Sequence, residues 1–276
     1  MTTISTLLAC MRTDRSNDEL LVVVADLARR FSAAVIGVAA RQLSLHSSIT
    51  AVGPGELRAH EFEKFRERAA TVEAEFRSAL SGVDNLQWRS PLTAGPASQH
   101  VASEARAADL LVAAVEAGEH VFLPSPEIEV SDLIMRVGRP VLMAPPGAAG
   151  LTLTRTLVCW KDSSESRRAI ADALPILKAS NAVDVVELAH EHEMELARGC
   201  VADVSDWLHR HGVEATCVAT PLKGAESAHL AQFAEDIKAD LIVAGAFGHS
   251  RLREWGFGGV TRDFLAKTER CTLLSH

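Results

Sequence analysis

The chain repeats its own pattern of residues, and this repeat restricts the possible folds more than any other feature. Residues 109–114 read DLLVAA, and residues 240–245 read DLIVAG. The starts of the two halves match as well, at residues 6–10 and 156–160. A pattern that occurs once in each half predicts two copies of one folding unit within a single polypeptide.

Short apolar runs alternate with amphipathic stretches in both halves. Strands are predicted near residues 4–9, 33–39, 85–89, 109–114, 140–144, 155–160, 182–189, 213–219, 240–244 and 271–275. Helices are predicted near residues 17–30, 55–81, 97–107, 131–135, 164–179, 193–211, 225–238 and 259–268. This alternation indicates an α/β fold, in which helices cover both faces of a parallel sheet and ligands bind at the carboxyl ends of the strands.

The length and charge of the chain indicate the number of domains and exclude some kinds of partner. A chain of 276 residues is long enough for two domains, which we expect at residues 1–147 and 151–276, joined by the Pro- and Gly-rich residues 145–150. The net charge of −8 argues against a nucleic-acid partner, because phosphate contacts need clustered Lys and Arg. We expect no membrane partner and no export signal, since the apolar runs are short.

The cysteines indicate the compartment. The five cysteines are odd in number and widely spaced, and they include no C-x-x-C pair. This pattern favours reduced thiols in a cytoplasmic protein.

A glycine-rich segment at residues 245–261 carries the clearest functional signal. It follows an apolar run at residues 240–244 that reads as a buried strand, and it leads into the helical pattern at residues 259–268. Glycine permits a sharp turn or a close approach of the backbone, because it lacks Cβ. The free amide groups at the start of a helix attract anions. A strand, a glycine-lined loop and a helix start therefore suggest that this segment binds a nucleotide phosphate.

This segment closely resembles the nucleotide loop of the universal stress protein family, which is written G-x2-G-x9-G-(Ser/Thr). Its three glycines correspond to Gly245, Gly248 and Gly258. Gly259 stands where nucleotide-binding members carry Ser or Thr, so one hydroxyl contact to phosphate is missing. Val260 and Thr261 continue the pattern. The resemblance implies that the second half binds ATP or a related adenine nucleotide, with no residue acting catalytically and no metal site.

The resemblance also implies an architecture. The family fold is a five-stranded α/β sandwich, members with two fused copies are common, and their closing strands pair across a two-fold axis. Residues 140–144 and 271–275 are the matching segments here, so we expect an internal pseudo-dimer of the two halves. Whether two chains pair further to form a homodimer stays open.

Asp162 lies just after the first strand of the second half, where the family has an Asp that contacts the adenosine part of the nucleotide. Alternatively, Asp162 caps the N-terminus of the following helix, as Asp and Ser often do. The bulky Trp160, near the expected base pocket, either stacks on adenine or blocks it.

The first half lacks the corresponding loop. Only Gly118 remains there, Glu116 and Glu119 would repel phosphate, and Pro124 and Pro126 impose a different backbone. We therefore predict that the first half binds no nucleotide in the family manner.

Two alternatives to a non-catalytic nucleotide binder remain. One is a scaffold or interaction module whose pocket is empty, and the other is a weak ATP hydrolase of the same superfamily. An H-x-G-H signature, an S-G-G-x-D-S loop and a Walker A lysine loop are all absent from the sequence. His190 and His192, read as the end of a strand, would share a face that a metal could use. Without a recognisable third ligand, solvated side chains explain them better.

Overall fold

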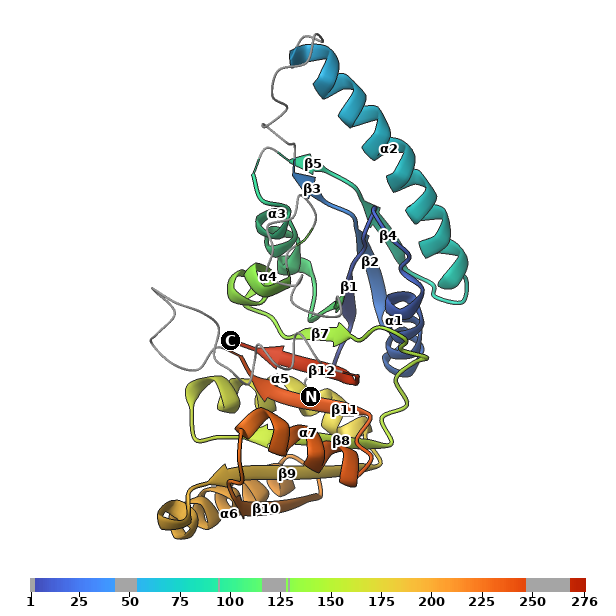
Figure 1. Ribbon diagram of the computed structural model, residues 1–276. Coiled ribbons are helices and arrows are strands. Elements are labelled where there is room, and N and C mark those ends of the chain that lie inside the picture. Colours follow the sequence, from blue (N-terminus) through green and yellow to red (C-terminus); the bar gives the residue numbers. More distant parts are fainter. Residues whose placement is uncertain (1–2, 43–53, 94, 116–127, 129, 247–268) are drawn as a thin grey trace.

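The computed structural model describes residues 3–42, 54–93, 95–115, 128, 130–246 and 269–276 (Figure 1). The first half contains β1 (Thr6–Cys10), α1 (Asp18–Phe31), β2 (Ala34–Val38), β3 (Arg41–Gln42), α2 (Pro54–Ala79), β4 (Leu86–Arg89), β5 (Leu92–Thr93), α3 (Ala97–Glu104), the 3-10 helix η1 (Ala105–Ala107), β6 (Leu110–Ala114), α4 (Val130–Val137) and β7 (Val141–Ala144). The second half contains β8 (Arg155–Trp160), α5 (Ser164–Ala179), β9 (Ala182–Ala189), the 3-10 helix η3 (Glu191–Glu193), α6 (Met194–Arg210), β10 (Ala215–Pro221), α7 (Glu226–Asp236), β11 (Leu241–Gly245) and β12 (Cys271–Ser275).

One ten-stranded sheet runs through the molecule in the order β10-β9-β8-β11-β12-β7-β6-β1-β2-β4. The strands within each half are parallel, and both halves place their strands in the same spatial order. The predicted α/β class, with a parallel sheet in each half, is therefore confirmed.

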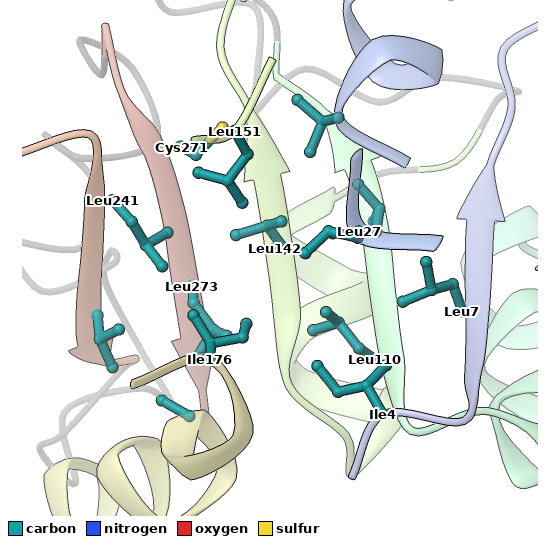
Figure 2. Packing of buried hydrophobic residues seen from close by; sticks show 14 of the residues in the cluster. Ile4, Leu7, Leu27, Leu110, Leu142, Leu151, Ile176, Leu241, Cys271 and Leu273 are labelled. Carbon is teal, nitrogen blue, oxygen red and sulfur yellow. The ribbon is translucent and has the colours of Figure 1, made fainter. Parts of the chain in front are cut away.

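The two halves meet through their closing strands. β12 pairs antiparallel with β7, so that Leu273 lies opposite Leu142, and the neighbouring pairs are Thr272 with Met143 and Leu274 with Val141. The resemblance implied that these closing strands pair, and the structure shows that the pair is antiparallel. Both strands are wholly buried, as expected for strands covered on both faces. The hydrophobic core is continuous across the join, where side chains of both halves gather around these strands (Figure 2).

Helices cover both faces of the sheet. The core on one face includes residues of α1, α2, α5 and α6, and the core on the other face includes residues of α3, α4 and α7. The side chains of β8 alternate accordingly, because successive residues of a strand point to opposite faces. Val158 and Trp160 join the first core, whereas Leu157 and Cys159 join the second.

The repeated aspartates have a structural role in both halves. The Asp109 carboxylate accepts hydrogen bonds from the backbone amides of Ser5 (2.8 Å) and Thr6 (3.0 Å) at the start of β1. Asp240 likewise accepts from the amides of Thr154 (2.8 Å) and Arg155 (3.1 Å) at the start of β8. Each aspartate satisfies backbone donors where a central strand begins.

The structure differs from the sequence prediction in two places. β3 and β5 pair as a separate two-stranded sheet that was not predicted. The strand β9 ends at Ala189, so His190 and His192 do not lie on a strand; His190 caps η3 instead. The helix expected at residues 259–268 lies outside the described residues.

Candidate functional site

The carboxyl ends of β8 and β11 form the topological switch point of the second half. From β8 the chain moves outward to β9 and β10, and then returns to the other side of β8 as β11. In open α/β sheets, ligands bind in the crevice outside the carboxyl ends of the strands at such a switch point. Asp162 lies in the connection after β8, and Gly245 is the last residue of β11.

Gly245 lies directly against the first turn of α5. A Cβ atom at Gly245 would stand 2.7 Å from the backbone carbon of Glu165 and 2.7 Å from the backbone nitrogen of Ser166. Its φ is not among the positive values found in the described residues. Close approach, and not a left-handed turn, is thus what requires glycine at this position.

The N-terminus of α5 is capped by Ser163 and not by Asp162. Ser163 has extended backbone angles (φ −140°, ψ 162°), and its Oγ accepts a hydrogen bond from the Ser166 amide at 3.2 Å. Glu165 lies in the same turn, where a hydrogen bond from its own backbone amide lowers its pKa. The capping interpretation of Asp162 is therefore wrong, because the neighbouring hydroxyl takes that role.

Asp162 keeps a half-exposed carboxylate, 54% accessible, that forms an ion pair with Arg167. It lies at the edge of a cavity of about 410 Å³ between α5 and α6. A ligand that hydrogen bonds to Asp162 would have to share it with this guanidinium or displace it.

Trp160 belongs to the same cavity. Its side chain is 9% exposed and packs in the core beneath α5 and α6. Nε1 of its indole is buried and has no hydrogen-bond partner among the described residues. The indole of Trp160, at the end of β8, thus forms part of the wall of the cavity between α5 and α6.

The other predicted nucleotide contacts lie outside the described residues. These are Gly248, Gly258, Gly259, Val260 and Thr261. Of the predicted site, the structure therefore places Asp162 and Gly245, which it brings to the same edge of the sheet.

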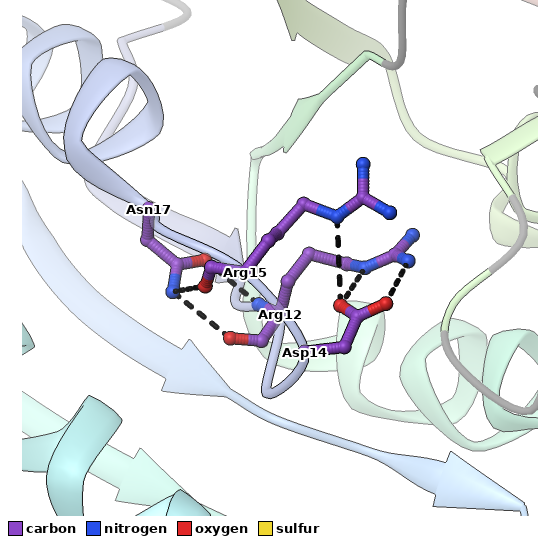
Figure 3. Close-up of polar contacts among 4 residues, drawn as sticks. All are labelled: Arg12, Asp14, Arg15 and Asn17. Atoms are coloured by element: carbon purple, nitrogen blue, oxygen red, sulfur yellow. Dashed lines mark hydrogen bonds and ion pairs between the residues drawn. The ribbon is translucent and has the colours of Figure 1, made fainter.

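The first half has a different loop at the equivalent place. Arg12 follows β1 at the position where Asp162 follows β8. Its guanidinium forms two hydrogen bonds to Asp14, at 3.0 and 2.9 Å, and Arg15 adds an ion pair at 3.5 Å (Figure 3). Asn17 closes the loop, since its side chain accepts from the Arg12 amide and donates to the Arg12 carbonyl. Burial alone would raise the pKa of Asp14, but Arg12 and Arg15 lower it to about 2.

Several residues around the cavity were not predicted from the sequence. Glu187 lies on β9 directly beside Trp160, and Asp203 and Trp207 line the cavity from α6. A sequence signal was present, because Glu187 is an acidic residue inside an apolar run that was read as a strand.

Other site types find little support in the described parts of the chain. No group of three or more His, Cys, Asp or Glu side chains there could hold a metal ion. His190 and His192 stack on each other with ring centroids 5.8 Å apart. All five cysteines are free thiols, of which Cys10, Cys159 and Cys271 are buried. Among the described helices, none is long and apolar enough to cross a membrane.

The fold matches known structures along almost the whole chain. A universal stress protein from Archaeoglobus fulgidus superposes with a TM-score of 0.76 at 13% identity, covering 98% of this chain and 97% of that one. A putative universal stress protein from Pseudomonas aeruginosa gives 0.58 at 14% identity, with 99% and 93% covered. A functionally unknown protein from the same species gives 0.56 at 13% identity, with 99% and 92% covered.

Sequence comparisons add nothing to this likeness. No protein-family model matches the chain, and no curated protein matches it. At identities this low, the structural likeness establishes the fold alone: the chain has the fold of universal stress proteins over nearly its full length.

Proposed function

We propose that this chain is a cytoplasmic stress-response protein of the universal stress type that binds ATP or a related adenine nucleotide in its second half. The nucleotide lies at the carboxyl ends of β8 and β11 and undergoes no reaction there. Binding changes the conformation of the chain or its choice of protein partner.

One observation carries this proposal. Gly245 brings the end of β11 against the first turn of α5, directly beside the loop that presents the half-exposed carboxylate of Asp162. Gly245 and Asp162 thus lie at one switch point, which supports a nucleotide site there. The family pattern in the sequence supplies the remaining contacts, from Gly248 to Thr261.

The second half binds the nucleotide, and the first half does not. In the second half, Asp162 accepts a hydrogen bond from the ribose, and the backbone amides near Gly258 and Thr261 hold the phosphates. In the first half, Arg12 occupies the place of that aspartate and is held by Asp14. The first half therefore serves the internal interface and holds no nucleotide.

Calorimetric titration of ATP into the full chain tests the proposal. We expect one nucleotide bound per chain, with affinity reduced about tenfold or more in Asp162→Ala, because a hydrogen bond to a charged group is lost. Asp206→Ala, which removes an exposed carboxylate of α6, serves as the control and should bind normally.

Two results would replace the proposal with an alternative. An absence of ATP binding at millimolar concentration would favour the scaffold. Release of phosphate above the buffer control, abolished in Asp162→Ala, would favour the ATP hydrolase.

A further inference from the structure

The cavity between α5 and α6 has the features of a ligand site of its own. It opens beside Asp162 and extends along the face of the sheet that these helices cover. Its volume of about 410 Å³ falls within the range of small-molecule sites. The lining residues are Trp160, Asp162, Arg167, Ile170, Cys200, Asp203, Val204 and Trp207.

Two buried polar atoms lie beside this cavity. Nε1 of Trp160 and Oε2 of Glu187 have no hydrogen bond within the part of the chain that the structure describes. The two residues face each other in register on β8 and β9, so their side chains leave the same face of the sheet. Leaving a buried donor or acceptor unpaired is costly, and such atoms in native proteins call for a partner. A ligand that accepts from the indole and donates to the carboxylate would satisfy both.

The charge around the cavity is negative. Asp162 and Asp203 lie in its wall and Glu187 lies beside Trp160. Among the described lining residues, Arg167 is the single cation, and it already pairs with Asp162. Burial raises the pKa of Glu187 to about 7, with a further contribution from Asp162 and Glu193 that exceeds the opposing effect of Lys161. This environment repels phosphate and attracts a cation.

The rest of the lining is apolar and aromatic. Trp160 and Trp207 present two indoles, and Ile170 and Val204 add aliphatic surface. A cation placed near an indole face is attracted by the ring, and the attraction grows when water is excluded. The lining therefore suits a flat apolar body that carries a positive charge.

We propose that the cavity between α5 and α6 binds a small organic cation, an amine carried on a flat apolar body with one hydrogen-bond acceptor. The ammonium group lies between Glu187 and Asp203, and the acceptor receives the indole N–H of Trp160. The cavity shares Asp162 with the proposed nucleotide site, but the amine itself contacts Glu187, Asp203 and Trp160, so its binding is measured without nucleotide.

Nuclear magnetic resonance of the indole N–H groups tests this site on the full chain. The protein has only four tryptophans, so their side-chain N–H signals are few, and Trp160→Phe identifies the relevant one. Tyramine is the probe at pH 8. Its neutral analogue 2-(4-hydroxyphenyl)ethanol and its anionic analogue 3-(4-hydroxyphenyl)propionate keep the phenol and change the charge. Trp88, which packs on Phe76 in the first half, is the internal reference.

We expect tyramine to shift the Trp160 and Trp207 signals in a saturable manner and to leave Trp88 unchanged. The two analogues should bind at least tenfold more weakly. Glu187→Gln and Asp203→Asn should each weaken tyramine binding, by about tenfold for Glu187→Gln, because a charged hydrogen bond is lost. Asp206→Asn, on the same helix but outside the cavity, should bind as the unaltered chain does.

Three results would overturn the proposal. These are equal binding of the neutral or anionic analogue, unchanged tyramine affinity in both Glu187→Gln and Asp203→Asn, and the absence of any tyramine-dependent shift at Trp160. An unchanged circular dichroism spectrum and an unchanged Trp88 signal in each variant verify that both halves are folded, so a loss of binding is assigned to the cavity.

Discussion

Gly245 and Ser166 approach so closely that no side chain fits between them. A Cβ atom on Gly245 would lie 2.7 Å from the Ser166 nitrogen, and that nitrogen belongs to backbone that the Ser163 cap holds in place. The end of β11 and the start of α5 are thus fixed relative to each other at the proposed nucleotide site.

Gly245→Ala should therefore destabilise the protein by about 1 to 3 kcal/mol, the usual cost of forcing extra volume into a packed region. Urea unfolding followed by circular dichroism measures this change. Gly199→Ala is the matched control, because Gly199 is exposed on α6 and a Cβ there meets nothing within 4 Å. The control should stabilise the helix by about 0.5 to 1 kcal/mol. Equal effects of the two substitutions would refute the close approach.

Glu187 should make the protein less stable as the pH rises from about 4.5 to about 7. Its pKa is raised in the folded state, from 4.5 to about 7, so the folded chain binds the proton more tightly than the unfolded chain in this window. Stability falls with rising pH where the folded state holds more protons. Glu187→Gln should lose this component and gain stability at pH 8 relative to the unaltered chain. Unfolding curves at pH 5 and pH 8 test the difference, and the same pH dependence in both proteins would contradict it.

Leu142 and Leu273 should be energetically coupled across the join of the two halves. Both are fully buried and lie opposite each other in the β7–β12 pair. Each substitution to Ala should cost about 2 to 5 kcal/mol, because it leaves a cavity in the core. The change in the free energy of unfolding of the double variant should differ from the sum of the two single changes by about 0.5 kcal/mol or more, as is usual for residues in contact. Strict additivity in a double-mutant cycle would show that the halves do not share a core here.

Asp14 should contribute stability that is present above about pH 4 and is lost as the pH falls toward 2. Its pKa is lowered from 3.8 to about 2 in the folded state, so the folded chain favours the ionised carboxylate. Asp14→Asn should lower the melting temperature at pH 7 and should flatten its decline between pH 4 and pH 2. Calorimetry over this range measures both effects. Asp84→Asn, on an exposed turn before β4, is the control and should change neither.

The sequence predicts the repeated frame well, for a physical reason. Strands covered on both faces need unbroken apolar runs, such as Leu110–Ala114 and Leu241–Gly245, and these stand out against polar helices. Asp109 and Asp240 recur because each accepts two backbone hydrogen bonds at the start of a central strand. By contrast, β3 and β5 are two residues long, which is too short to show any period.

The site was less predictable than the fold. Asp162 and Ser163 are both good helix caps, and only the backbone angles of Ser163 decide between them. The face toward which Trp160 points depends on the register of β8, and its neighbour Glu187 depends on the pairing of β8 with β9. The local sequence pattern does not predict which strands pair, so the cavity between α5 and α6 could be identified only from the structure.

A crystal structure of the full chain grown with ATP and magnesium is the decisive test of nucleotide binding in the second half. We expect one nucleotide, with its ribose at Asp162 and its phosphates at the glycine-rich loop that follows β11, and no nucleotide at the equivalent crevice beyond β1 and β6. Nucleotide bound beside Arg12 in the first half, or ATP at saturating concentration without density at β8 and β11, would contradict it.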